Sequence, residues 1–153
     1  MFGRFSVNSI VVELELEHKI IKQKISNLST LITERDFSRN TEQLANEIEQ
    51  FIKIILIHHQ KEEETVYKEL INQNRNADIE LIEKITSDHR FLEDLCKSIL
   101  KLLIRVLHNL EPMRCGAIGA DISFMLNKYN EHYLIEEEFI FQIHENLMSG
   151  SLP

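Results

Sequence analysis

The sequence predicts an all-α protein built as an up-down-up-down antiparallel four-helix bundle. Glycine and proline, which interrupt helices, occur only 4 and 2 times in 153 residues, whereas helix-favouring leucine, glutamate and lysine are frequent. Apolar residues also recur at alternating intervals of three and four in four long segments, which is the spacing of one buried helix face. Short polar segments separate the four, so consecutive helices are expected to pack antiparallel.

Length, charge and composition limit the class of protein. We expect one complete domain over residues 1–153, because this length can bury a core without crosslinks. A formal charge of -8 and a pI near 5.4 argue against binding to nucleic acid or to an anionic membrane. The chain has no signal-peptide pattern or membrane-span pattern, so we expect a soluble, cytoplasmic protein. Cys96 and Cys115 form neither a disulfide framework nor a zinc-ribbon spacing.

The first half of the chain predicts helices over about residues 9–33 and 41–72. The first has one stripe, interrupted by a histidine: Val11, Leu14, His18, Ile21, Ile25, Leu28 and Ile32. The second begins after Asn40, which with Gln43 resembles a capping box. One face of it consists of Leu44, Ile48, Phe51, Ile55, His58 and Glu62. Because the segment is apolar nearly all round, a competing face remains open, namely Ala45, Ile52, Leu56, His59, Glu63, Val66 and Leu70.

The second half predicts helices over about residues 77–111 and 116–148. The former ends before Pro112, which disfavours helical backbone in the preceding residue. Its stripe has one histidine and consists of Ile82, Ile85, His89, Leu92, Cys96, Ile99, Leu103, Val106 and Leu110. The last stripe has a histidine and a glutamate and consists of Ile118, Ile122, Met125, Tyr129, His132, Glu136, Phe139 and Ile143.

The polar interruptions of the four stripes fall at one height of the bundle. Counted from the predicted turns, they lie within about two to three helical turns of one level, and they are His18, His58, Glu62, His89, His132 and Glu136. Two unpaired carboxylates in an apolar interior would each cost several kcal/mol and would repel each other. No lysine or arginine lies on the stripes. Two divalent metal ions, bridged by the glutamates and each bound by two imidazoles, would satisfy every group.

The pattern HxxxE occurs twice, and residues four apart project from one face of a helix. "HHQKEEETVY" aligns with "HYLIEEEFIF" at an offset of 74 residues (58 to 132), and the lone histidines are 71 residues apart (18 to 89). Each helical hairpin therefore contributes one lone histidine and one HxxxE pair, as a pseudo-twofold site requires. The alignment favours His58 with Glu62, and His59 with Glu63 remains the alternative.

In these motifs the chain resembles the hemerythrin-like, or HHE cation-binding, family. The family pattern is a lone histidine, an HxxxE, another lone histidine and a second HxxxE on four successive helices, and here it runs from His18 to Glu136. The resemblance implies that the six residues bind two non-haem iron ions. It further implies that Glu62 and Glu136 bridge the irons beside an oxo or hydroxo group, and that the small ligand is O₂ or NO.

The chain departs from the invertebrate oxygen carriers that it resembles. They have a second histidine four residues after the third-helix one, where this chain has Glu93, and they end with a histidine and an aspartate five apart, where it has His132 and Glu136. Without the extra histidine, each iron would keep one open position. Glu93 either closes one of these positions or, as we expect, is a solvated surface residue.

Other polar residues near the pattern are expected to take no part in metal binding. Three histidines lie off the preferred stripes and are expected at the surface, namely His59, His108 and His144. Cys96 is expected in the core, and the phenols of Tyr67 and Tyr129 are expected to pack rather than to contact the site. Two carboxylates of each glutamate triple, 62–64 and 136–138, are expected to face water.

Two functional classes follow from this pattern. The favoured hypothesis is a non-haem di-iron protein that binds or senses O₂ or NO, or responds to iron. The alternative is a di-iron enzyme that reduces NO or peroxide, or supports iron-sulfur cluster repair. The pattern contains no nucleophile, base or substrate pocket beyond the ligands, which favours the first. A metal-free helical bundle is the third reading, and ligand type alone leaves manganese and zinc open.

Overall fold

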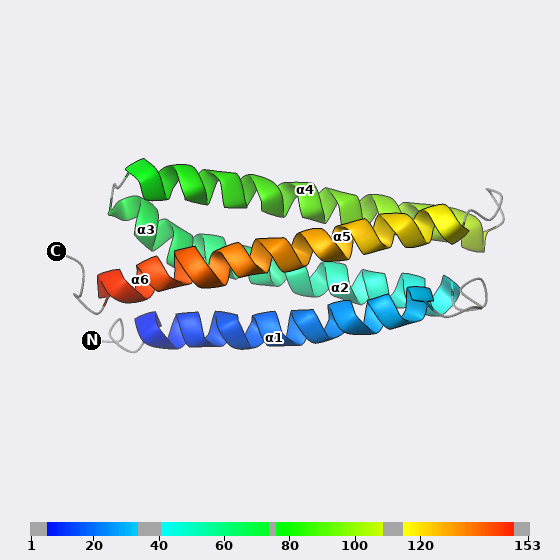
Figure 1. Ribbon diagram of the computed structural model, residues 1–153, viewed down its shortest axis with the longest axis horizontal. Coiled ribbons are helices and arrows are strands. Elements are labelled where there is room, and N and C mark those ends of the chain that lie inside the picture. The colour runs from blue at the N-terminus through cyan, green and yellow to red at the C-terminus, as the bar shows by residue number, and fades with distance from the viewer. Residues whose placement is uncertain (1–5, 34–40, 74–75, 109–114, 149–153) are drawn as a thin grey trace.

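The computed structural model describes residues 6–33, 41–73, 76–108 and 115–148. In these ranges the chain forms four long helical rods and no strand (Figure 1). The first rod is α1 (Ser6–Thr33), and the third is α4 (Asn76–Leu107). The second consists of α2 (Thr41–Glu62), the π-helical turn η3 (Glu63–Tyr67) and α3 (Lys68–Asn72). The fourth consists of α5 (Cys115–Ile135), the π-helical turn η4 (Glu136–Ile140) and α6 (Phe141–Met148).

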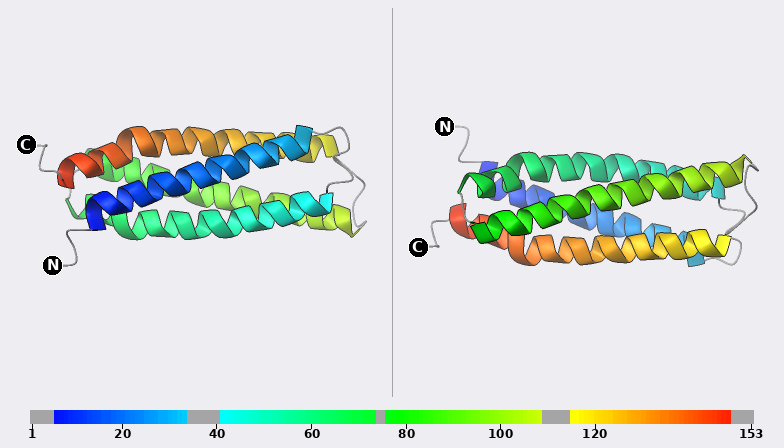
Figure 2. Two further views of the ribbon diagram at one scale, coloured as in Figure 1. Left: turned by 90° about the horizontal axis from the view of Figure 1, so that it is seen from below. Right: turned by 90° about the horizontal axis from the view of Figure 1, so that it is seen from above.

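The rods run alternately up and down in an elongated bundle. Around the bundle, α1 packs against α2 and α5, and α4 packs against the same two helices from the other side (Figure 2). The start of α1 and the end of α6 lie at the same end (Figure 1). This arrangement confirms the predicted all-α, up-down-up-down four-helix bundle.

The apolar interior is divided into two clusters along the bundle axis. The cluster nearer the start of α1 includes Val11 and Leu14, and the larger cluster, toward the end of α1, includes Ile21 and Ile25. His18 lies between them on the same face of α1. On α4, His89 lies between Ile85 and Leu92 in the same way, so that a polar layer separates two apolar regions.

Each π-helical turn shifts the buried face of its rod by about one residue, because a π turn holds one residue more than an α turn. The fourth stripe was expected to continue through Phe139 and Ile143, but Phe139 is 53% exposed and Ile140 is buried in its place. For the same reason His144, expected at the surface, is only 2% exposed. The straight helical period used for the sequence does not include this shift.

Two predicted helix ends fall outside the part of the chain that the structure describes. They are the capping box at Asn40 and the segment from 109 to Pro112. His108 follows α4 and is exposed, as predicted. Within the described ranges, no helix is both long enough and apolar enough to cross a membrane.

Candidate metal centre

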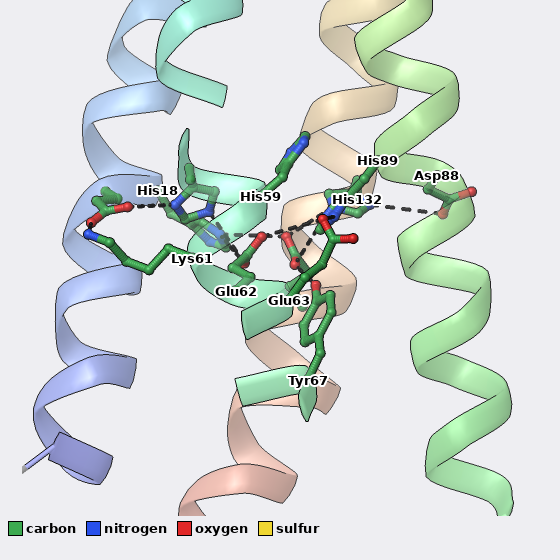
Figure 3. A network of polar contacts seen from close by, with 12 residues as sticks. His18, His59, Lys61, Glu62, Glu63, Tyr67, Asp88, His89 and His132 are labelled. Atoms are coloured by element: carbon green, nitrogen blue, oxygen red, sulfur yellow. Dashed lines mark hydrogen bonds and ion pairs between the residues drawn. The ribbon is translucent and has the colours of Figure 1, made fainter. Parts of the chain in front are cut away.

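The six residues predicted as metal ligands meet in the polar layer. Figure 3 labels four of them, His18, Glu62, His89 and His132. None is more than 3% exposed, and all four rods contribute: His18, His58, Glu62, His89, His132 and Glu136. The expected height match between the helices is therefore present. Their role as ligands remains a prediction, and their arrangement can now be compared with what a pair of metal ions requires.

Glu62 contacts histidines from three helices through both of its oxygens. Its Oε2 lies 3.3 Å from Nε2 of His18 and 3.3 Å from Nε2 of His58. Its Oε1 lies 3.4 Å from Nε2 of His89. One carboxylate therefore faces the α1–α2 side of the layer with one oxygen and the α4 side with the other, which is the orientation of a bridging ligand.

Glu136 occupies the matching place on the fourth rod. Its Oε1 lies 3.0 Å from Nε2 of His132 and 3.6 Å from Nε2 of His18, and its Oε2 lies 3.5 Å from Nε2 of His89. The Tyr67 hydroxyl donates a hydrogen bond to Oε2. Packing alone was expected for this phenol, so its contact with a candidate ligand corrects that expectation.

The two carboxylates lie at the two π-helical turns. Glu62 is the last residue of α2 before η3, and Glu136 is the first residue of η4. A π turn widens the backbone locally, and such turns are frequent at functional sites. Here the irregular turn follows each HxxxE pair and brings the next residues, Glu63 and Glu137, to partly buried positions.

The electrostatics of the layer disfavour two ionised carboxylates side by side. Burial, and then the charge of Glu136, raise the pKa of Glu62 well above its usual value. Burial also acts to raise the pKa of Glu136, but its histidine neighbours, His132 first, hold it well below the usual value. Among the described residues, the two carboxylates contact each other, four histidines of the layer and one tyrosine. Without a cation, such a pair is stable only when it holds a proton between its members.

An outer ring of carboxylates faces the other nitrogen of each histidine. A carboxylate at Nδ1 keeps the ring proton on that nitrogen and leaves Nε2 unprotonated, which is the usual second contact of a metal-bound histidine. The Nδ1 distances are 2.8 Å from His58 to Glu17, 3.0 Å from His18 to Glu137 and 3.4 Å from His89 to Glu63. Asp88 lies farther from His132, at 3.9 Å, and Nδ1 of His132 has no hydrogen-bond partner among the described residues.

The inner atoms of the layer lack hydrogen-bond partners among the described residues. They include Nε2 of His58, His89 and His132 and one oxygen of each carboxylate. Buried polar atoms are rarely left unpaired, since each costs about 1–3 kcal/mol. Imidazole nitrogens and carboxylate oxygens that converge unpaired suit a transition-metal ion.

The donors divide into two groups, each with ligand atoms within 4.8 Å of one another. One group contains His18, His58, Glu62 and Glu136, and the other contains His59, His89 and His132. Two groups in one layer, with glutamates that face both, fit two metal ions rather than one. The second group contains a residue that the sequence kept only as the alternative to His58.

That residue is His59, and its expected surface position is wrong. His59 is 0% exposed, and its ring is stacked on His89 at a centroid distance of 3.8 Å. Its Nδ1 lies 3.4 Å from Oε1 of Glu93, which is also buried, at 3% exposed, and bound by Arg90. The expectation that Glu93 is a solvated surface residue is therefore wrong too. The competing apolar face of α2 was the signal, because a helix that is apolar nearly all round is buried on two faces.

The remaining candidates lie beside the layer. Cys96 is a core residue, as expected, and burial raises the pKa of its thiol to about 12. The hydroxyl of Tyr129 lies 3.8 Å from its sulfur, so this phenol packs as expected. Only the third carboxylate of each glutamate triple, Glu64 and Glu138, is exposed, because the second pairs with a histidine of the layer.

Comparison with known families identifies the chain. The hemerythrin HHE cation-binding domain matches residues 9–144, nearly the whole described bundle, so the chain belongs to this family. Searches of curated proteins and of solved structures gave no match. The fold and the family thus define a helical cation-binding domain whose donor cluster lies at the middle of the bundle.

Proposed function

We propose that this protein holds two iron ions in its polar layer and binds or senses O₂ or NO there. The observation that carries the proposal is the orientation of Glu62 and Glu136. Each carboxylate contacts histidines from both helical hairpins, α1–α2 and α4–α5. Bound iron would supply an electron-rich binding position for a diatomic molecule. Manganese and zinc accept similar donors, so the choice of iron rests on the family.

The burial of the layer favours a very small ligand. The candidate ligands are at most 3% exposed, and apolar clusters lie on both sides along the axis. A hollow in the surface reaches His132, with Asp88 and Phe91 in its lining. A diatomic molecule needs little more space than side-chain motion provides, whereas an organic substrate would need a preformed pocket at the layer.

The chain's own residues have three separate tasks. The histidines provide neutral Nε2 donors, and the outer carboxylates fix that tautomer. Glu62 and Glu136 neutralise positive charge and set the spacing of the two positions. The hydroxyl of Tyr67 satisfies an oxygen of Glu136, which holds that carboxylate in place. The apolar clusters exclude bulk water and thereby slow loss of a bound ligand or oxidation by solvent species.

Stopped-flow spectroscopy of the anaerobically reduced, iron-loaded protein tests this function. The expected result is a new absorption band on mixing with O₂ or NO that disappears when the gas is removed. The matched control is His144→Phe, because His144 is buried but lies outside both donor groups. This control is expected to give the same band.

Sustained consumption of NO or peroxide, with many turnovers per chain, would contradict a carrier or sensor and would favour the enzyme alternative. Absence of any band in a protein that contains two irons would contradict both. Zinc or manganese in place of iron, in protein purified from iron-supplied cells without added metal, would contradict the choice of metal.

A further inference from the structure

The inference concerns His59 and rests on the proposed di-iron function. His59 follows His58 on α2, and a step of one residue turns the side chain by about 100° around the helix. His58 accordingly meets α1 through Glu17, whereas His59 meets α4 through Glu93 and His89. The two adjacent histidines therefore reach opposite halves of the polar layer.

His59 shares two features with His58 and His89, which are predicted ligands. A carboxylate, Glu93, faces its Nδ1, and its Nε2 is buried without a hydrogen-bond partner among the described residues. The Nδ1 atoms of His18, His58 and His89 face carboxylates in the same manner. An unpaired buried nitrogen costs about 1–3 kcal/mol unless a ligand binds it. Nδ1 of His144 is unpaired as well, so the argument for His59 also needs its position in the layer.

Position within the layer also separates His59 from an ordinary buried histidine. Its ring lies 3.8 Å from that of His89 and 5.9 Å from that of His132. The three offer ligand atoms within 4.8 Å of one another, whereas His144, equally buried, belongs to neither donor group.

The pseudo-twofold arrangement is broken at this position. The offset of the two HxxxE motifs matches His59 to Tyr133 (59 to 133), and Tyr133 packs on His18 at 4.4 Å as His59 packs on His89. One half of the layer therefore has an imidazole where the other has a phenol. The α4 side of the layer has three histidines, His59, His89 and His132, and the α1 side has two, His18 and His58.

We propose that His59 is a fifth histidine ligand, supplied by α2, and that it makes the two iron positions unequal. The iron held by His59, His89 and His132 then has its open position filled. The iron held by His18 and His58 keeps room for a diatomic ligand. Glu93, which stands where the oxygen carriers resembled by this chain have a histidine, acts through its contact with Nδ1 of His59. It is a positioning residue rather than a ligand.

Proton NMR of the iron-loaded wild-type protein tests this without any substitution. Each iron-bound imidazole has one exchangeable ring N–H, and the iron shifts its signal far from the diamagnetic range. We expect five such signals, which disappear in D₂O. Four signals in a protein that contains two irons would overturn the inference and leave the proposed function intact.

Variants provide a second measurement. His59→Phe and His59→Gln are expected to weaken binding of one iron by at least about tenfold, the size of effect known for contacts around metal ligands. The wild type is expected to give two unequal Mössbauer doublets. In both variants the two doublets should become equal. His144→Phe is the control and should change neither quantity. Two irons per chain with unchanged doublets in His59→Phe would overturn the inference, even if ligand binding changed. Wild-type protein without iron would instead overturn the proposed function.

Discussion

The α1–α2 hairpin and the α4–α5 hairpin contribute equivalent groups to the polar layer. Each supplies a lone histidine, a histidine and glutamate four residues apart, and two outer carboxylates. The outer carboxylates correspond as well, since Glu17 and Asp88 precede the lone histidines, and Glu63 and Glu137 follow the central glutamates. Each feature that the halves share is one that a bridged pair of cations requires.

The two hairpins differ at two pairs of corresponding positions. His59 corresponds to Tyr133, and Tyr67, whose hydroxyl reaches Glu136, corresponds to Phe141, which packs on His18. Under the proposed function, the shared groups would hold the pair of cations and the differing ones would make its two positions unequal. Substitutions of the shared groups are therefore expected to have larger effects than substitutions at the positions that differ.

The largest effect is expected from Glu62→Gln. This change removes the charge that faces both halves, so iron content should fall below one atom per chain. The metal-free variant should be as stable as metal-free wild type or more stable by about 1–3 kcal/mol, because repulsion between two buried carboxylates is relieved. Metal analysis and urea denaturation measure these quantities. The exposed Glu64→Gln is the matched control, and two irons in Glu62→Gln would exclude a bridging role.

The outer carboxylates are expected to have the next largest effect. Glu63→Gln and Glu137→Gln each replace the carboxylate at Nδ1 of a lone histidine by a neutral amide, whose oxygen is a weaker acceptor. Each should lower iron affinity by about 10–100-fold, measured by competition with a chelator. Because the two positions correspond, the losses should be of similar size. The control is Glu138→Gln, at an exposed position; an equal loss there would show that the effect is only one of surface charge.

The pH dependence of metal-free stability should separate His58 from His132. Burial, and then the charge of His18, lower the pKa of His58 to about 4. Burial acts in the same direction on His132, but Glu136 and Asp88 outweigh it and raise its pKa to about 9. His58 thus takes up a proton on unfolding between pH 4 and 6.5, and His132 releases one between pH 6.5 and 9. Stability should fall on both sides of a maximum near pH 6.5, by up to about 1.4 kcal/mol per pH unit for each group.

Urea denaturation of chelator-treated protein across this range measures the profile. His132→Gln should flatten the alkaline side of the stability profile, because it removes the group whose pKa is raised. His58→Gln should flatten the acid side, because it removes a group whose pKa is lowered. The raised pKa of Glu62 lowers stability as pH rises above 4.5, so it opposes His58 on the acid side and adds to His132 on the alkaline side. The pKa of His59, which burial lowers to about 3, adds to the acid side. A metal-free profile that rises steadily from acid to alkaline pH would contradict this electrostatic description.

The smallest effect is expected from Tyr67→Phe, which makes the two halves more alike. The change removes the hydroxyl that binds Glu136 and keeps the ring. It should destabilise the protein by about 1.5 kcal/mol, the usual size for a hydrogen bond to a charged group, and should shift the iron absorption spectrum. Tyr129→Phe removes a hydroxyl whose contact is a thiol at 3.8 Å and should leave the spectrum unchanged. If both variants had the same iron absorption spectrum as the wild type, a role of Tyr67 at the metal centre would be excluded.

The sequence predicted the fold and the six inner residues because both depend on helical periodicity. A stripe such as that of α1 identifies a buried face, and a histidine within it is then buried at a known height. The repeat of HxxxE favoured the pair of His58 with Glu62 over the pair of His59 with Glu63. Periodicity also identified a second apolar face on α2, and this face is the one that contains His59.

The remaining features depend on what a straight, isolated helix does not show. The π-helical turns η3 and η4 shift the faces that follow them, which buries His144 and exposes Phe139. The outer carboxylates lie between stripes, and their contacts depend on how neighbouring helices are rotated about their axes. The burial of Glu93 likewise follows from the rotation of α4 toward His59. A search for acids at the same offset as the ligands would have found Glu17 with Asp88 and Glu63 with Glu137.

Metal analysis of protein produced with iron in the growth medium and purified without added metal tests the central claim most directly. We predict two iron atoms per chain, and a melting temperature that falls when a strong chelator removes them, because a metal bound only by the folded state stabilises it. Less than about half a metal atom per chain, with a melting temperature unchanged by chelator, would contradict a metal centre in this bundle.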